Sequence, residues 1–153
     1  MADVVSPSKR SEMMSGIRGK NTKPELLIRC GLFSRGFRFR LHASKLPGKP
    51  DIVLPKYRAI IMVNGCFWHG HGCPLFKWPS SRLDFWREKI EDNRKHDAES
   101  LGALKMQGWK TLVVWECATK GRGKWPVEKL LEAIEKWVVE GNESLEIGGQ
   151  YVG

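Results

Sequence analysis

The sequence predicts an α/β domain in which a mixed β-sheet lies between helices. The spacing of apolar residues alternates between helical and extended repeats, in the order helix, three strands, helix, strand, helix. The chain of 153 residues is 41% hydrophobic and 28% charged, and no internal repeat or low-complexity tract interrupts it. Such a chain is long enough to bury a core, so we expect a single domain over residues 1–153.

The first predicted element is a helix that begins at Thr22. The segment 22–25 has a capping-box pattern with proline in the first turn, and Gly36 marks the end of the helix. The apolar residues expected on its buried face recur at helical spacing: Leu26, Leu27, Cys30 and Phe33. This spacing favours a core role for Cys30 over a metal-ligand role.

Extended patterns come next. Residues 37–41 alternate like a strand, and residues 49–63 contain two short β-branched runs joined by residues 55–57. The segment 110–117 is typical of a buried strand and ends at Cys117. We expect these segments to form one mixed sheet.

Two further helices are predicted. The longer one begins at Ser80 and Ser81 and ends before Gly108, and its expected apolar face is Leu83, Trp86, Ile90, Leu101 and Leu104. The second is amphipathic and carries Val127, Leu130, Leu131, Ile134 and Val138. Core packing is the expected role of three tryptophans: Trp109, Trp115 and Trp137.

The two ends of the chain lack such patterns. Residues 1–20 are predicted to be an N-terminal arm, and the glycine-rich residues 141–153 a loose tail. Residues 1–13 lack the apolar core of a secretory signal, and no apolar run is long enough to span a bilayer. We therefore expect no membrane association and a cytoplasmic, nucleoid-associated protein.

The charge balance points to a polyanionic partner. Lys and Arg outnumber Asp and Glu by 26 to 17, which gives a formal net charge of +9. Basic residues are spread over several segments, as in many nucleic-acid-binding domains. The alternative is a basic surface that serves only solubility.

The segment NGCFWHGHGC, residues 64–73, predicts a metal site. It supplies Cys66, His71 and Cys73, and the predicted sheet could bring Cys117 alongside them. Three thiolates and one imidazole form a closed tetrahedral set of the kind that structural Zn²⁺ prefers. The alternative is that Cys66 and Cys117 are small buried residues and that His71 is exposed.

Candidate catalytic groups flank this segment. His69 has an unperturbed pKa suited to proton transfer near neutrality, although a single surface histidine is more often inert. Asp51 begins a strand behind Gly48 and Pro50, where its carboxylate could hold Mg²⁺ for phosphodiester cleavage. Glu25 could bind a metal-ligated water. Turn formation would equally explain Asp51, and helix capping would equally explain Glu25.

Aromatic residues beside basic ones suggest contact with nucleobases. Phe67 and Trp68 lie in a glycine-flanked turn, and Trp86 lies among Arg82, Arg87 and Lys89. Such rings can stack on bases or wedge into a duplex step. Packing in the protein core is the alternative for each ring.

Four motifs resemble those of a known family. PGKPDIVL, GCFWHGHGCPLF, FWREKIEDNRKHD and GWKTLVVWEC resemble, in order and spacing, motifs of the very-short-patch repair (Vsr) DNA mismatch endonucleases, from about Ser11 to Lys124. The resemblance implies a variant of the PD-(D/E)xK restriction-endonuclease fold with a structural zinc. It also implies nicking of double-stranded DNA at a T:G mismatch left by deamination of 5-methylcytosine. A functional link to a cytosine-5 DNA methyltransferase and to the repair machinery follows from it too.

The resemblance also implies roles for individual residues. Asp51 would hold the catalytic Mg²⁺ together with the main-chain carbonyl of Val63. His69 would transfer a proton, and Glu25 would order metal-bound water. The remaining implied residues are the zinc ligands Cys66, His71, Cys73 and Cys117 and the DNA contacts Met14, Phe67, Trp68, Trp86, Lys89 and Lys120.

Position 64 departs from part of this family, because some members have Thr-His where this chain has Val63 and Asn64. A carbonyl ligand at position 63 survives the change. An amide cannot transfer a proton at neutral pH, although it can hydrogen-bond a phosphate oxygen. We therefore expect reduced or pH-shifted activity if Asn64 stands in for a catalytic imidazole.

Two alternative functions stay open at this stage. One is a zinc-containing mismatch- or DNA-binding protein without catalysis. The other is a zinc hydrolase for small substrates in which His69 and His71 are both ligands. A T:G mismatch is an asymmetric target, so the main interpretation predicts a monomer.

Overall fold

The structure, a computed structural model, describes residues 22–150. The helices are α2 (Lys23–Ser34), α3 (Leu83–Met106) and α4 (Val127–Glu140). The strands are β1 (Arg40–Leu41), β2 (Ile52–Leu54), β3 (Ala59–Asn64), β4 (Lys110–Trp115) and β5 (Leu145–Ile147). Two short 3-10 helices are η2 (Pro55–Tyr57) and η3 (Glu116–Ala118).

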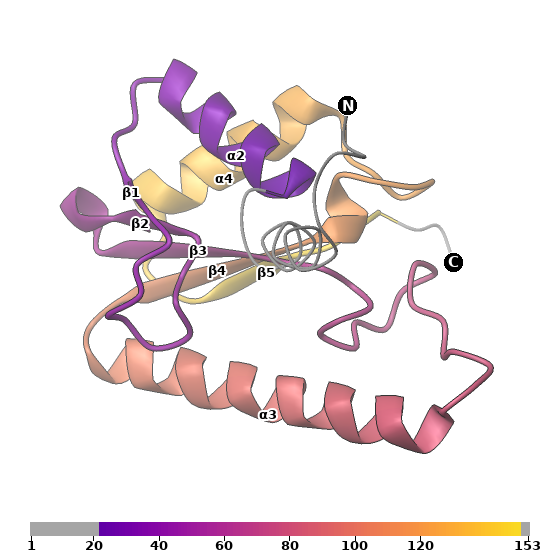
Figure 1. The fold of residues 1–153 in the computed structure, drawn as a ribbon. Coiled ribbons are helices and arrows are strands. Elements are labelled where there is room, and N and C mark those ends of the chain that lie inside the picture. The colour runs from indigo at the N-terminus through magenta and orange to yellow at the C-terminus, as the bar shows by residue number, and fades with distance from the viewer. Residues whose placement is uncertain (1–21, 151–153) are drawn as a thin grey trace, which may run out of the picture.

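The strands form one mixed sheet with helices on both faces. Its order is β1-β2-β3-β4-β5, antiparallel from β1 to β3 and parallel from β3 to β5. Helices α2 and α4 lie side by side over one face, and α3 crosses the other (Figure 1). The predicted mixed α/β architecture is therefore confirmed.

The two faces of the sheet bury different residues. Ile61, Leu112 and Val114 pack toward α2 and α4. Ile60, Met62 and Val113 belong to a second core cluster with Leu104 of α3. The alternation follows from the two-residue period of a strand, and it explains why β3 and β4 are apolar at almost every position.

Helix α2 begins as predicted but buries a different face. Thr22 is its N-cap, and the Thr22 Oγ1 atom accepts a hydrogen bond from the main-chain N–H of Glu25 at 3.4 Å. The buried residues are Glu25, Ile28 and Leu32, which recur at three- and four-residue spacing. Cys30 is exposed, so the prediction that it is a core residue is wrong.

Two other residues of the predicted face of α2 are also exposed. Leu26 is exposed, and Phe33 has an exposed fraction of 55%. The face toward α4 is instead formed around Gly31, where an added β-carbon would lie 2.5 Å from Leu131. This close approach of the two helices leaves Leu26 and Phe33 on the outer side.

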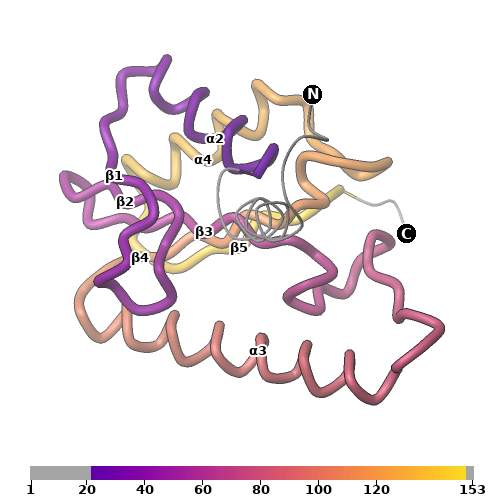
Figure 2. The backbone as a smooth tube through the Cα atoms, viewed as in Figure 1, coloured from indigo at the N-terminus to yellow at the C-terminus, as the bar shows by residue number. Residues whose placement is uncertain are grey.

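The connection between β3 and α3 differs in part from its prediction. The chain leaves β3, runs through an irregular loop beside the sheet and turns back into α3 (Figure 2). The residue before α3 is Arg82, whose φ of 54° is left-handed and whose side chain makes no cap hydrogen bond. Ser80 and Ser81 are thus not the N-cap, and the prediction that they start the helix is wrong.

The predicted loose tail is wrong for residues 145–147. They form β5, which pairs in parallel with β4. The tail is further fixed by Lys110, whose ammonium donates to the carbonyls of Trp137, Val138 and Gly141 at 2.6–3.0 Å. A cation at the carboxyl end of α4 also complements the helix dipole.

Residues 37–41 and the three tryptophans expected in the core can also be compared with their predictions. The strand predicted over residues 37–41 is limited to β1, because the main-chain N–H of Phe37 donates to the carbonyl of Leu32 at the end of α2 and only residues 40 and 41 pair with β2. Trp137 is buried, and Trp109 and Trp115 pack against the core at its edge, as predicted. No helix within residues 22–150 has the length and apolar character needed to cross a membrane.

Candidate active site

A large cleft of about 1250 Å³ opens at the end of β3. Its walls come from the start of α2, the segment 48–51, the turn 64–69, one side of α3 and the segment 116–120. Among its lining residues are seven that the sequence predicted as functional: Asp51, Val63, Asn64, Phe67, Trp68, His69 and Lys120. The fold therefore brings side chains from separate segments to one cavity.

Asp51 lies in this cleft immediately before β2. Its Oδ2 atom accepts a hydrogen bond from the main-chain N–H of Val63 at 2.7 Å, which fixes the carboxylate beside the end of β3. The pKa of Asp51 is raised from 3.8 to about 6, mainly by burial and in part by the nearby Glu25 carboxylate, while the Val63 hydrogen bond opposes the rise. A cation beside Asp51 would stabilise the ionised form of its carboxylate.

Glu25 faces Asp51 from the start of α2 and is 1% exposed. Its Oε2 atom accepts from Arg29 at 2.9 Å and lies 2.7 Å from Nε2 of His42. Both contacts involve the carboxylate, so the acid does more than cap its helix. His42 was missed by the sequence interpretation, because only the pairing of β1 with β2 brings it beside Asp51.

These residues fit a divalent cation. One carboxylate oxygen of Glu25, one of Asp51 and one ring nitrogen of His42 all lie within 4.8 Å of one another. Oxygen ligands suit hard cations such as Mg²⁺, which often take only one or two carboxylates from a protein. The buried carboxylate of Glu25 and the partly buried one of Asp51 repel each other, which further favours a cation between them.

His69 has a partner that the sequence did not identify. Its Nδ1 atom lies 2.5 Å from Oδ2 of Asp97 on α3. Because a carboxylate accepts hydrogen bonds, Asp97 selects the tautomer with a proton on Nδ1 and leaves Nε2 available. Asp97 also lines the cleft. Its position in the helix 83–106 gave no indication of this pairing.

Asn64 ends β3 at the inner wall of the cleft. Its side chain is 9% exposed, and within residues 22–150 it has no hydrogen bond to another side chain or to the backbone. A buried amide without a protein partner is unusual in a folded chain. Asn64 is thus available to a ligand in the cleft.

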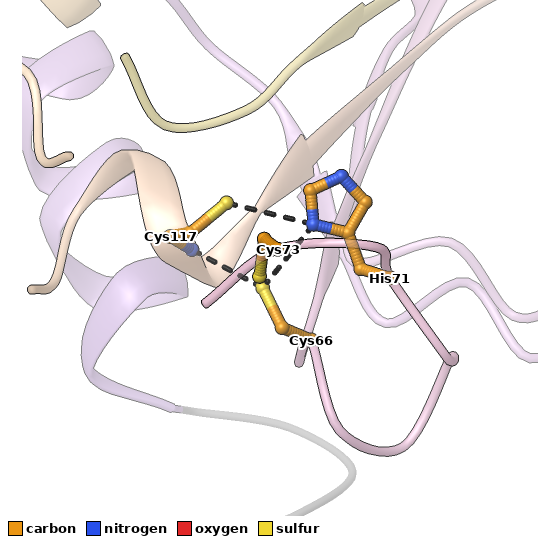
Figure 3. Close-up of side chains that lie close together, drawn as sticks. All are labelled: Cys66, His71, Cys73 and Cys117. Carbon is orange, nitrogen blue, oxygen red and sulfur yellow. Dashed lines mark hydrogen bonds between the residues drawn. The ribbon is translucent and has the colours of Figure 1, made fainter. Parts of the chain in front are cut away.

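The four predicted metal ligands, three from the turn and Cys117 from η3, come together in the structure. One atom each of Cys66, His71, Cys73 and Cys117 lies within 4.8 Å of the others. The Nδ1 atom of His71 lies 3.6 Å from Sγ of Cys66 and 3.5 Å from Sγ of Cys117 (Figure 3). Figure 3 shows the sulfur of Cys73 beside that of Cys66, so all four groups face a common centre.

The spacing of this cluster fits a tetrahedral metal. Zinc bond lengths to sulfur and nitrogen imply about 3.6 Å between neighbouring ligand atoms, close to the two distances measured here. Burial raises the pKa of the Cys66 thiol and lowers that of the His71 imidazole, so a cation is needed to stabilise the thiolate form. The donor set of three thiols and one imidazole is the one preferred by structural zinc.

The four residues Cys66, His71, Cys73 and Cys117, which we call the cysteine cluster, are linked to His69 through Trp115. The ring of His71 stacks on Trp115 with 4.1 Å between centroids, and His69 meets the same indole edge-on at 6.3 Å. The Trp115 Nε1–H donates to Glu146 Oε1 at 2.8 Å. His69 is not among the grouped metal ligands, which argues against the interpretation of His69 and His71 as two ligands of one hydrolytic zinc.

Aromatic rings gather at the mouth of the cleft. Phe67 lies 5.3 Å from both Trp68 and Trp86, and Trp68 lies 5.7 Å from Trp86. The cluster continues outward through three further rings that the sequence analysis did not single out: Phe76, Trp78 and Phe85. We call these six rings the aromatic cluster.

The outer rings of the aromatic cluster are accompanied by basic side chains. Phe85 and Trp78 are 46% and 45% exposed. The Arg82 guanidinium lies 4.4 Å from the Phe85 ring centre and Arg87 lies 5.9 Å from that of Trp78. Such an exposed aromatic and cationic surface suits a nucleic-acid partner.

The predicted DNA-contacting lysines differ in position. Lys120 lines the cleft, 3.8 Å from Glu116, whereas Lys89 is exposed on α3. Lys23 and Lys49 also line the cleft and were not predicted. Met14 lies outside the described residues.

Comparisons with known proteins identify a matching family and several relatives of this chain. A family description, DNA mismatch endonuclease Vsr, matches residues 2–75. The type II nicking enzyme V.XorIIP of Xanthomonas oryzae pv. oryzae is 50% identical over 123 residues, which cover 80% of this chain and 90% of that protein. DNA mismatch endonuclease Vsr of Escherichia coli K12 is 41% identical over 150 residues, 98% of this chain and 96% of that protein. The type II nicking enzyme V.NmeAIP of Neisseria meningitidis is 46% identical over 122 residues, 80% of this chain and 87% of that protein.

Proposed function

The chain belongs to the Vsr family of DNA mismatch endonucleases, and on this premise we propose that it is a Mg²⁺-dependent enzyme that nicks DNA at T:G mismatches. Relatives named as a mismatch endonuclease and as type II nicking enzymes support DNA mismatch nicking. The T:G specificity, which fits the product of 5-methylcytosine deamination, is our proposal. So is the assignment of the mixed sheet to the PD-(D/E)xK variant of the restriction-endonuclease fold.

One observation supports this proposal above the others. Asp51, the pair of His69 and Asp97, and the ring of Trp68 all line the same cleft. An acid for cation binding, a proton-transfer group and a base-stacking surface thus lie within reach of one DNA strand. This combination suits phosphodiester cleavage beside a distorted base pair.

The Mg²⁺ site in this proposal uses Asp51 and the main-chain carbonyl of Val63, with Glu25 orienting water. When bound, the ion would supply stabilisation of the negative charge that builds on the phosphate oxygens during cleavage. Asp51 is fixed for this role by its hydrogen bond from Val63. Asn64 adds an amide that can hydrogen-bond a phosphate oxygen.

His69 is the proposed proton-transfer residue. Asp97 holds the proton on Nδ1, so Nε2 can take or give a proton at the scissile phosphate. Trp115 restrains the ring from one side. A fixed tautomer and a fixed ring orientation are the two conditions for this role.

The aromatic cluster is the proposed mismatch sensor. Phe67, Trp68 and Trp86 would wedge into the duplex beside the mismatch, with Met14 of the N-terminal arm as a further contact. Unstacking a step costs a few kcal/mol, and least where the bases are mispaired. Lys89 and Lys120 would contact the DNA backbone, where Lys23 and Lys49 also line the path.

The cluster of Cys66, His71, Cys73 and Cys117 is the proposed structural zinc site. Zinc bound there would hold the turn that carries Phe67, Trp68 and His69. The segment NGCFWHGHGC, residues 64–73, would thus combine metal ligands and aromatic residues because the bound metal fixes the position of the aromatic rings. A monomer, acting with a cytosine-5 DNA methyltransferase and the repair machinery near the nucleoid, completes the proposal.

The decisive experiment is nicking of labelled duplexes that carry T:G or T:A at one position. They are tested in several flanking contexts, with Mg²⁺ and without it, using zinc-loaded protein. We expect a Mg²⁺-dependent nick in the thymine strand of the T:G duplex alone, and none with Asp51→Ala. Equal nicking of both duplexes would contradict the mismatch specificity.

A binding protein without catalysis is the alternative, and Asn64 is the observation that favours it. An amide at the inner wall of the cleft cannot carry a proton to the phosphate. Selective binding of the T:G duplex without cleavage in any context would support this alternative. The nicking assay and a parallel binding titration therefore separate the two functions.

A further inference from the structure

The position of His42 is set by the pairing of β1 with β2. His42 follows β1 directly, and its main-chain N–H donates to the carbonyl of Asp51 at 3.0 Å. The register of β1 with β2, in which Leu41 pairs with Ile52, therefore sets His42 opposite Asp51. The antiparallel ladder fixes the two residues relative to each other.

The backbone of His42 is strained. Its φ of 47° lies in the left-handed region, which few residues other than glycine adopt. Such conformations cost of order 1–3 kcal/mol and persist where the surroundings enforce them, often at functional sites. Here the strained conformation accompanies a side chain that lies beside the carboxylates of Glu25 and Asp51.

The side chain of His42 completes a set of three potential ligands. Its Nε2 atom lies 2.7 Å from Oε2 of Glu25, and one potential ligand atom from each of His42, Glu25 and Asp51 lies within 4.8 Å of the other two. Adjacent ligands of an octahedral cation lie roughly 3 Å apart. Ligation would require the tautomer in which Nδ1 of His42 carries the proton and Nε2 is free to bind, so the cation would replace the hydrogen bond between His42 and Glu25.

We propose that His42 is a direct ligand of the catalytic divalent cation together with Asp51 and Glu25, so that Glu25 binds the ion itself and does not act only through metal-bound water. The inference rests on the proposed nuclease function, whose metal site it makes more specific. A mixed set of two carboxylates and one imidazole binds Mn²⁺ and Co²⁺ more tightly, relative to Mg²⁺, than oxygen ligands alone do. The protein would then accept Mn²⁺ as a preferred cation in this cleft.

The test is pulsed electron paramagnetic resonance of bound Mn²⁺, which detects nitrogen nuclei attached to the ion. The full chain is first loaded with zinc, so that the cysteine cluster does not take up Mn²⁺, and it is labelled with ¹⁵N-histidine. Spectra are recorded with and without an uncleavable T:G duplex. The label distinguishes histidine nitrogen from nitrogen of the DNA bases.

We expect ¹⁵N coupling in the wild-type protein and its loss in His42→Gln. Glutamine keeps a hydrogen-bond donor for Glu25 but lacks the imidazole. His96→Gln is the matched control, because His96 is exposed on α3, and it should keep the coupling. In titrations, His42→Gln should weaken Mn²⁺ binding about tenfold or more and Mg²⁺ binding much less.

Three results would overturn the proposal. The first is the absence of histidine coupling in the wild-type protein, with and without DNA. The second is coupling that survives His42→Gln but is lost in His69→Gln. The third is an equal loss of Mn²⁺ and Mg²⁺ affinity, which would leave His42 only a positioning partner of Glu25.

The electron paramagnetic resonance result does not depend on whether the protein cleaves DNA. Protein that shows histidine coupling but nicks no duplex would support the metal site and contradict the proposed function. Protein that nicks the T:G duplex without histidine coupling would support the function and contradict the role of His42.

Discussion

The Nδ1 atom of His69 lies 2.5 Å from the Oδ2 atom of Asp97. The two residues come from different elements, since His69 belongs to the turn after β3 and Asp97 to the middle of α3. The packing of α3 under the turn therefore determines the tautomer of the histidine. This packing is close at Gly70, where an added β-carbon would lie 2.7 Å from Ile90 of α3.

Asp97→Asn should lower the nicking rate by roughly two orders of magnitude, because the amide can also stabilise the wrong histidine tautomer. Binding of the T:G duplex should remain, since Asp97 holds no charge complementary to DNA. The pH profile of nicking should also change, which a loss of stability alone would not cause. Single-turnover rates and binding titrations measure these effects.

The matched control is Asp92→Asn, an exposed carboxylate on the same helix. It should leave both the rate and its pH profile unchanged. A rate for Asp97→Asn within a few-fold of the wild-type value would show that Asp97 does not orient a catalytic histidine.

The stability of the Mg²⁺-free protein should depend on pH through Asp51. Its pKa rises from 3.8 to about 6 on folding, so the folded chain holds this proton more tightly than the unfolded chain does. The contribution to stability is therefore present below pH 4, decreases as pH rises to about 6 and stays absent above it. The rise in pKa corresponds to roughly 3 kcal/mol as an upper value.

Asp51→Asn removes this ionisation. At pH 7 the variant should be more stable than the wild-type protein by up to roughly 3 kcal/mol, and the difference should shrink toward pH 4. Urea denaturation of zinc-loaded protein at several pH values measures it, with Asp92→Asn as the control. A difference that does not change with pH would mean that Asp51 is not the titrating group.

The four cysteines of this chain should differ in their contribution to zinc binding, because Cys30 does not belong to the cysteine cluster. Cys73→Ser and Cys117→Ser should reduce bound zinc from one ion per chain toward none, because a closed site loses a ligand. Loss of the ion should lower the melting temperature and expose the turn 64–73 to protease. Elemental analysis, calorimetry and limited proteolysis test these effects.

Cys30→Ser is the control that the fold provides. Cys30 is exposed on α2, away from the cluster. The variant should keep one zinc and an unchanged melting temperature. Full zinc content in Cys73→Ser would contradict the four-ligand site.

The local sequence patterns predicted much of this structure. Apolar runs located β2, β3, β4 and α4, because buried strands and an amphipathic helix leave clear periodicities. The four residues of the cysteine cluster were also predicted, since their donor types are rare and three of them are close in the sequence. These features depend mainly on local composition.

Features that depend on tertiary packing were not predicted. The buried face of α2 follows from its contact with α4 at Gly31, and β5 forms only because β4 offers a free edge. His42 and Asp97 reach the cleft through strand register and helix packing. Neither residue lies in a local pattern that differs from that of an ordinary surface residue.

Asn64 leads to the last prediction. Its side chain is buried at the inner wall of the cleft, without a protein hydrogen bond in the described part of the chain. An imidazole at this position would add a group that titrates near pH 6.5 and can exchange a proton with the phosphate. Asn64→His should therefore raise the nicking rate by about tenfold and add an ionisation to its pH profile.

The control for this change is Asn142→His, which places an imidazole on an exposed position after α4. It should alter neither the rate nor the profile. The comparison is made under single-turnover conditions, so that product release does not mask the chemical step. An unchanged rate and profile for Asn64→His would mean that His69 already supplies all the proton transfer this cleft requires, and that Asn64 acts through hydrogen bonding alone.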